Sequence, residues 1–99
     1  MSQESQGELD VIQKVEVPQK YKVILLNDDF TPMNFVTFIL QRFFSKTVSE
    51  AEQIMLDVHK KGAGVAGIYT KEVAEMKVHQ VNDLAKQNEY PLKTIMEAE

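Results

Sequence analysis

Runs of hydrophobic residues, separated by polar and glycine-containing breaks, predict the elements of this chain. Residues 21–26 form a short apolar run with β-branched and aromatic side chains, which is typical of a strand buried on at least one face. Thr31-Pro32 then has the pattern of a helix start, a hydroxyl to cap free N–H groups followed by proline. The helix is predicted to run to about Phe44, with an apolar period of Val36, Ile39, Leu40 and Phe43.

A second helix is predicted after Thr47. Thr47 and Glu50 have the spacing of a capping box, and apolar residues recur with helical period at Ala51, Ile54, Met55 and Val58. Lys60 and Lys61 suit a helix C-terminus, and Gly62 suits the position just after it.

The last third of the chain predicts a strand, a helix and a second strand. Residues 63–69 are rich in glycine and alanine, which indicates a strand of small residues beside something bulky. Thr70 is expected to cap a helix that ends near Asn88, with Ala74, Val78, Val81 and Ala85 on its apolar face. Residues 92–96 suit a short edge strand. The order β-α-α-β-α-β predicts an α+β domain, with three helices packed on a three-stranded antiparallel sheet.

Composition divides the chain into two parts. Residues 1–20 are polar and acidic and contain too little apolar surface to offset their ordering entropy, so they are predicted to form a flexible N-terminal arm. Residues 21–99 are predicted to form one small domain. The whole chain has 99 residues, 43% of them hydrophobic, which suits a single modest core.

Charge and cysteine content narrow the function. Eleven basic residues against 15 acidic ones give a net charge of −4, which argues against binding to nucleic acid or an anionic membrane surface. The chain has no cysteine, which suits a reducing compartment, so a cytoplasmic location is expected. No apolar run approaches the roughly 18 residues of a membrane span, and the acidic N-terminus is unlike a signal peptide.

Candidate chemistry gathers where the first strand meets the first helix. Neighbouring carboxylates in Asn27-Asp28-Asp29 repel each other unless a cation or several donors lie nearby. This segment is therefore either a solvated turn or an acceptor site for a metal ion or an ammonium group. His59 flanks the core face of the second helix, as a helix-end residue or a ligand, whereas His79 is predicted to face solvent. Met33 could line a pocket that accepts several apolar shapes.

Catalytic signatures are weak. The sequence contains no recognised Ser/His/Asp order, no phosphate-binding glycine loop and no metal motif of known spacing. No enzymatic activity and no cofactor are therefore expected.

The run from Tyr21 to Met33, YKVILLNDDFTPM, closely resembles the opening of the ClpS family of bacterial protease adaptors. The resemblance covers residues 19–96 without a gap. It continues through Phe35-Val36, Phe43-Phe44, Met55-Leu56-Asp57-Val58-His59, Gly62, Gly67, Glu72-Val73-Ala74-Glu75, Lys77 and Pro91-Leu92.

This resemblance implies an adaptor that binds proteins with a free N-terminal Leu, Phe, Tyr or Trp, called an N-degron. The adaptor would deliver them to an AAA+ unfoldase, ClpA or ClpC, with the peptidase ClpP. By position, Asn27, Asp29 and His59 would engage the α-amino group, and Asp28 would add negative potential. The side chain would enter a pocket made by Thr31, Pro32, Met33, Val36, Met55, Val58 and Leu92.

The resemblance also implies more specific roles. The position of Met33 acts in the family as a gate against β-branched residues. Glu72 and Lys77 fall at positions associated with docking on the unfoldase, and the N-terminal arm would serve delivery.

Two other functions compete with this interpretation. One is a divalent-metal-binding or hydrolytic protein in which Asp28, Asp29 and His59 hold Mg²⁺ or Mn²⁺. The other is a plain protein-interaction domain that uses the edge strand or the charged face of the third helix.

Overall fold

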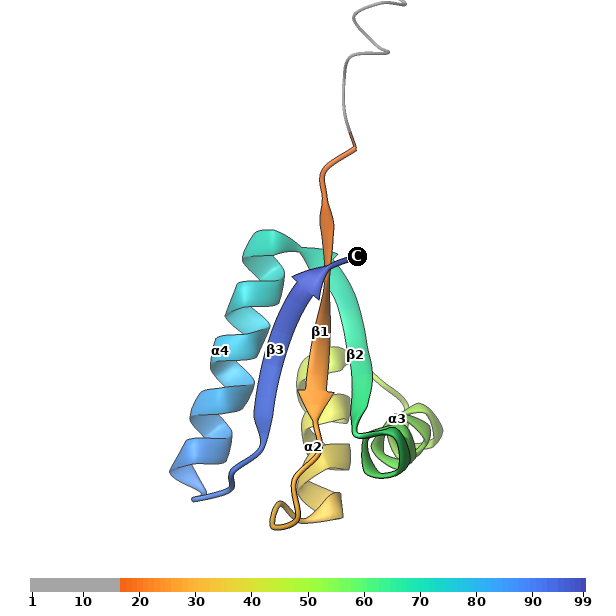
Figure 1. The fold of residues 1–99 in the computed structure, drawn as a ribbon, viewed down its shortest axis with the longest axis vertical. Helices are drawn as coiled ribbons and strands as arrows, with labels where there is room; N and C mark the ends of the chain where they lie inside the picture. Colours follow the sequence, from red (N-terminus) through yellow and green to blue (C-terminus); the bar gives the residue numbers. More distant parts are fainter. Residues whose placement is uncertain (1–16) are drawn as a thin grey trace, which may run out of the picture.

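The computed structural model describes residues 17–99, and its elements follow the predicted order (Figure 1). They are β1 (Lys20–Leu26), α2 (Met33–Phe44), α3 (Val48–Lys61), β2 (Ala63–Thr70), α4 (Lys71–Gln87) and β3 (Lys93–Ala98). The last strand thus begins one residue later and ends two residues later than predicted. Residues 1–16 of the predicted arm lie outside the described residues, and the strand β1 begins within the arm's predicted range.

The three strands form one antiparallel sheet in the order β2-β1-β3, which confirms the predicted architecture. Ile24 lies opposite Val65 on one side and Ile95 on the other. A register shift in the β1–β2 pairing falls between Val23 and Ile24. The strand β1 is therefore the centre of the sheet, and its end at Leu26 leads directly into the candidate site.

The helices cover one face of this sheet, with α2 lying between α3 and α4 in Figure 1. Val23 and Leu25 of β1 point into the core and are fully buried. The largest other side chains that are almost completely buried come from α2, α4 and β3: Ile39, Leu40, Val81 and Thr94. Burying such aliphatic side chains contributes about 1.5 to 3 kcal/mol each, so this contact holds the helices on the sheet.

Small residues allow the strand β2 to approach the helix α3 closely. A Cβ atom at Gly64 would lie 2.8 Å from Val58 Cγ2 and 3.2 Å from the carbonyl oxygen of Ile54. Gly67 in the same strand lies beside the ring of Tyr69. These contacts confirm the prediction that the glycine-rich strand packs beside bulkier groups.

Two of the three predicted side-chain caps are confirmed. Thr47 Oγ1 accepts a hydrogen bond from Glu50 N–H at 3.1 Å, and Glu50 Oε1 accepts one from Thr47 N–H at 2.9 Å, which completes the capping box. Thr70 caps α4 by accepting from Val73 N–H. The helix α3 ends as predicted at Gly62, whose φ of 90° places it in the left-handed region that favours glycine.

The predicted cap of α2 is wrong. Pro32 occupies the N-cap position, and no side chain caps the helix. Thr31 lies one residue before the N-cap, and its hydroxyl donates to Asp28 Oδ2 at 2.8 Å.

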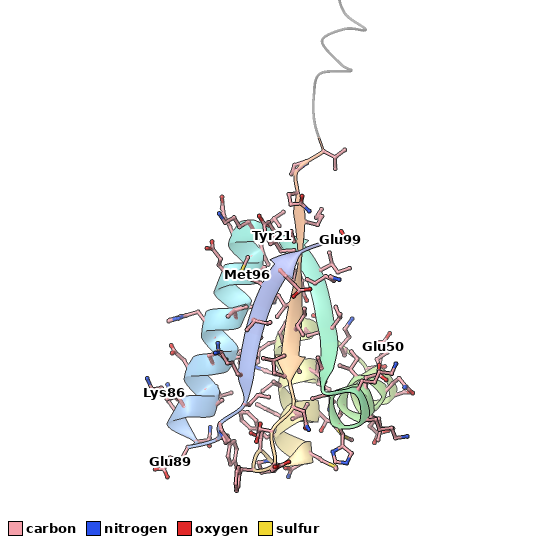
Figure 2. All side chains as sticks on the ribbon, viewed as in Figure 1. Tyr21, Glu50, Lys86, Glu89, Met96 and Glu99 are labelled. Carbon is pink, nitrogen blue, oxygen red and sulfur yellow. The ribbon has the colours of Figure 1, made fainter. Side chains whose placement is uncertain are left out.

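The chain end and the start of α2 lie at opposite ends of the sheet. Figure 2 shows Tyr21 and Glu99 together at one end, where Glu99 N–H donates to the carbonyl oxygen of Lys20 at 2.9 Å. Glu89 lies at the opposite end, where β1 leads into α2 (Figure 2).

In residues 17–99, none of the helices combines the length and hydrophobicity that a membrane span requires.

Candidate functional site

The loop of residues 27–32 is held against the end of α3. Asn27 N–H donates to the carbonyl oxygen of Gly62 at 2.9 Å. Because Gly62 follows the last turn of α3, this bond brings the loop beside His59 in that turn. The sequence separates Asn27 from His59 by a whole helical hairpin, and the fold brings them to one place.

Asp28 organises the loop from within. Its Oδ1 accepts hydrogen bonds from Phe30 N–H at 2.8 Å and from Thr31 N–H at 2.7 Å. Its Oδ2 accepts the hydroxyl of Thr31 at 2.8 Å. Both carboxylate oxygens are therefore engaged inside the loop, as in the turns that aspartate favours.

These bonds control the acidity of Asp28. Partial burial raises the pKa of the carboxyl, but the hydrogen bonds from the Thr31 backbone, the Thr31 hydroxyl and the Phe30 backbone together outweigh burial. The net result is a pKa below the usual aspartate value. Asp28 is therefore a carboxylate at neutral pH, which its bonded donors stabilise in the charged form.

The other polar side chains of the site are differently placed. Asn27, Asp29 and His59 are exposed. In the part of the chain that the structure describes, none of these three side chains takes part in a hydrogen bond or an ion pair. Their acceptor atoms are thus available to a ligand.

A cavity of about 170 Å³ opens between this loop, α2 and α3. Its polar lining comes from the loop and from the end of α3, and its apolar lining comes from the facing sides of the two helices. The lining residues are Asn27, Asp28, Asp29, Thr31, Met33, Val36, Met55, Val58 and His59.

The apolar walls differ in how firmly they are held. Val36 and Val58 are only 6% and 4% exposed and belong to the core as well as to the cavity. Met33 is 50% exposed and stands in the first turn of α2. A flexible thioether with a free side can change rotamer at little cost, so Met33 is the adaptable wall of the cavity.

The lining brings together all four predicted acceptor residues and five of the seven predicted pocket residues. Within residues 17–99, the lining contains no residue that the sequence had not indicated. Pro32 and Leu92 are not part of the lining. Pro32 caps α2 through its backbone position, and Leu92, 5% exposed, is packed in the core just before β3.

The two predicted docking residues have different surroundings. Glu72 is exposed in the first turn of α4. Lys77, the other predicted docking residue, is half-buried, and its Nζ donates to the carbonyl oxygen of Phe43 at 2.6 Å. The same ammonium lies 5.7 Å from the ring centroid of Phe44 and 5.3 Å from that of Tyr69. The Lys77 ammonium thus joins α4 to the end of α2.

The remaining candidates do not extend the site. His79 faces solvent as predicted, with Nε2 3.0 Å from Asp83 Oδ2. Among residues 17–99, no three His, Asp or Glu side chains are placed to hold a metal ion together. Asp28, Asp29 and His59 line one cavity but do not form a metal-binding group.

Comparison with known protein families gives one match that spans most of the domain. Residues 16–95 match the family described as ATP-dependent Clp protease adaptor protein ClpS. The matched range includes every residue that lines the cavity.

Individual relatives are similar over most of this chain. The ATP-dependent Clp protease adapter protein ClpS of Bdellovibrio bacteriovorus is 57% identical over 98 residues, which cover 99% of this chain and 86% of the relative. The corresponding protein of Gluconobacter oxydans is 58% identical over 80 residues, 81% of this chain and 67% of the relative.

A solved structure has the same fold. It is that of Agrobacterium tumefaciens ClpS2 bound to L-phenylalaninamide, which is 36% identical to this chain with a TM-score of 0.81. The similarity covers 84% of this chain and all of that one.

Proposed function

This chain belongs to the ClpS family of Clp protease adaptors, and from that premise we propose that its cavity binds the first residue of proteins that begin with Leu, Phe, Tyr or Trp. One observation carries the proposal: a single small cavity combines unengaged polar acceptors with apolar walls. A free N-terminal residue of this kind has the complementary chemistry, since an ammonium group and a large apolar side chain are both attached to its Cα atom.

The polar lining suits an ammonium group. An α-ammonium has three N–H donors and no acceptor, so its recognition requires several acceptors that converge on one point. Asn27 offers an amide oxygen, Asp29 a carboxylate and His59, when neutral, a ring nitrogen. None of these roles requires a base or a nucleophile, which agrees with an adaptor and not with a hydrolase.

The apolar lining suits the side chain. Val36 and Val58 give the cavity a fixed wall, and Met33 and Met55 give it adaptable ones. Agrobacterium tumefaciens ClpS2, which shares the fold, binds L-phenylalaninamide, a molecule with a free α-amino group and an aromatic side chain. That ligand is of the class proposed for this cavity.

The expected interaction free energies suit reversible binding of the protein that is to be delivered. Burial of one Leu or Phe side chain contributes roughly 1.5 to 3 kcal/mol, and each charge-assisted hydrogen bond about 1.5 to 3 kcal/mol. After the cost of association, affinity should be on the order of micromolar, near 8 kcal/mol.

Delivery completes the proposed function. We expect the bound protein to be passed in the cytoplasm to an AAA+ unfoldase, ClpA or ClpC, and then to ClpP. The exposed Glu72 is the proposed docking residue on α4, and residues 1–20 are proposed to serve delivery. The ion-binding alternative is not favoured, because residues 17–99 hold no group of three or more metal-ligating side chains.

Binding of short fluorescent peptides that differ only in their first residue tests the proposal. Peptides that start with Leu, Phe, Tyr or Trp should bind, whereas those that start with Ser or Asp should not. Acetylation of the Phe-initiated peptide removes the ammonium and should abolish binding. Equal affinity for the free and acetylated peptides would contradict the proposal, and saturable binding of Mg²⁺ or Mn²⁺ in its place would favour the metal site.

A further inference from the structure

Asp28 and Asp29 are neighbours in the sequence, yet their carboxylates have different surroundings. Asp28 accepts three hydrogen bonds, from Phe30 N–H, Thr31 N–H and the Thr31 hydroxyl, all at 2.8 Å or less. The carboxylate of Asp29 is exposed and has no hydrogen-bond or ion-pair partner within residues 17–99. Both residues nevertheless line the cavity.

The bonds of Asp28 determine the shape of the loop that carries the site. One end of this loop is fixed because Asn27 N–H donates to the Gly62 carbonyl oxygen. The other end is fixed because α2 begins at Met33. Between these ends, the bonds of the Asp28 carboxylate are the only side-chain hydrogen bonds that hold the described loop residues, so they set where the Asn27 and Asp29 side chains point.

We propose that Asp28 is a positioning residue of the ammonium site, which acts through the conformation of loop 27–32, whereas Asp29 supplies the carboxylate that meets the ligand. This assignment rests on the proposed function, because it requires the cavity to receive an ammonium group. It changes the role that the family resemblance implies for Asp28, in which its negative charge acts on the ligand directly.

Asparagine and alanine at position 28 separate these two roles. Asparagine keeps an oxygen that can accept from Phe30 N–H and Thr31 N–H, and its amide can donate to the Thr31 hydroxyl oxygen, since a hydroxyl is both donor and acceptor. Asparagine is also favoured in this kind of turn. Asp28→Asn therefore removes the charge and keeps the loop, whereas Asp28→Ala removes both.

The experiment titrates a Phe-initiated peptide against the wild type, Asp28→Asn, Asp28→Ala and Asp29→Asn. Asp28→Asn should bind within about threefold of the wild type, because the loop is retained. Asp28→Ala and Asp29→Asn should each bind at least about tenfold more weakly. Asp28→Ala loses the hydrogen bonds that hold the loop conformation, and Asp29→Asn loses the carboxylate that meets the ligand's ammonium group. Equal weakening by Asp28→Asn and Asp28→Ala would overturn the positioning role.

A second measurement follows the loop without any ligand. Hydrogen exchange of the Phe30 and Thr31 amides should be slow in the wild type, Asp28→Asn and Asp29→Asn, and faster in Asp28→Ala. Unchanged protection of both amides in Asp28→Ala, together with lost affinity, would mean that Asp28 acts on the ligand directly and would overturn the proposal. The two asparagine variants match aspartate in size. A general loss of folding in any variant would appear in urea unfolding and not in these two amides alone.

The outcomes separate this proposal from the one on which it rests. If the wild type binds no Phe-initiated peptide, both proposals fail. If the wild type binds only the unacetylated peptide and Asp28→Asn is as weak as Asp28→Ala, the proposed function is supported and the positioning role alone is wrong.

Discussion

The side-chain amide of Asn82 in α4 forms two hydrogen bonds with the backbone of Thr94 in β3. Asn82 Nδ2 donates to the Thr94 carbonyl oxygen at 3.0 Å, and Thr94 N–H donates to Asn82 Oδ1 at 2.9 Å. Among residues 17–99, β3 is an edge strand that pairs only with β1, so the amide takes the place of a neighbouring strand at this residue. It satisfies two backbone groups that an edge strand otherwise leaves open to another chain.

Replacement of this amide should weaken the fold. Asn82→Ala leaves two backbone groups of the buried Thr94 without their partners, so the free energy of unfolding should fall by about 1 to 3 kcal/mol in urea denaturation. Gln80→Ala, an exposed position of the same helix, is the matched control and should change stability much less. Equal effects of the two variants would contradict a bridging role of Asn82.

Lys77 should contribute to stability through its ammonium. Lys77→Met keeps a long aliphatic side chain of similar size. It loses the ammonium's hydrogen bond to the Phe43 carbonyl oxygen and its contacts with the rings of Phe44 and Tyr69. The free energy of unfolding should fall by about 1 to 2 kcal/mol. Lys71→Met, exposed in the same helix, should be nearly neutral. Wild-type stability of Lys77→Met combined with lost delivery to the unfoldase would support the docking role in place of the packing role.

Met33 should discriminate against ligand side chains that branch at Cβ. Its position at the exposed side of the cavity predicts that a peptide starting with Ile or Val binds at least about tenfold more weakly than one starting with Leu, a difference of about 1.4 kcal/mol. A branched Cβ would meet the Met33 side chain before its γ atoms reached the cavity. Met33→Ala should recover part of the difference. Equal affinity of the wild type for Leu and Ile would remove the gate.

His59 should make peptide binding sensitive to acid. A neutral imidazole can accept a hydrogen bond from the α-ammonium, whereas a protonated one cannot and adds a second cation beside Asp28 and Asp29. Affinity for a Phe-initiated peptide should therefore be lower when the imidazole is protonated than when it is neutral. Affinity should also fall on the alkaline side, because the peptide's α-amine, with a reference pKa of about 7.7 to 8.0, loses its proton there.

Substitution of each histidine tests whether His59 causes the loss of affinity in acid. His59→Ala should bind weakly at every pH and lose the acidic decline, whereas His79→Ala, outside the cavity, should change neither property. Wild-type affinity and an unchanged acidic decline in His59→Ala would show that Asn27 and the carboxylates hold the ammonium without the imidazole.

Asp28 should make stability depend on acid in a defined direction. Its pKa is lowered in the folded protein, because the hydrogen bonds from Thr31 and Phe30 outweigh the opposing effect of partial burial. Its contribution is therefore fully present above the unfolded-state pKa of about 3.9 and is lost as pH falls through the lower folded-state value. Wild type should exceed Asp28→Asn in unfolding free energy by a constant amount near neutral pH, and this difference should shrink below about pH 4. A difference that grows in acid would contradict the lowered pKa.

Features that depend on a few adjacent residues were predictable from the sequence. The capping box of Thr47 and Glu50 and the left-handed Gly62 are decided within one turn of helix, so their residue types suffice. Thr31 shows where this reasoning fails. A hydroxyl before proline is a good helix cap, but the helix begins one residue later than that role requires, and the hydroxyl is part of the Asp28 turn.

Features that depend on packing between distant segments were less predictable. The partner of Lys77 is a backbone carbonyl 34 residues away, and every residue has such a carbonyl, so nothing in the sequence singles out Phe43. Leu92 was placed in the pocket by resemblance; it is buried in the core and is not among the residues that line the cavity. The acceptor residues came together as expected because Asn27-Asp28-Asp29 and His59 each stand at the end of an element, and the two ends meet.

Gly64 gives the cavity a boundary that no ligand would touch. Val58 faces the cavity on one side and lies against the backbone of Gly64 on the other, where even a methyl group would come within 2.8 Å of its Cγ2 atom. Growth of the side chain at position 64 would therefore push Val58 toward the ligand. In evolutionary terms, drift at this position is coupled to the proposed choice of ligand. A change in a strand outside the cavity would reduce the range of side chains that the cavity accepts before it disturbed the residues proposed to bind the ammonium group.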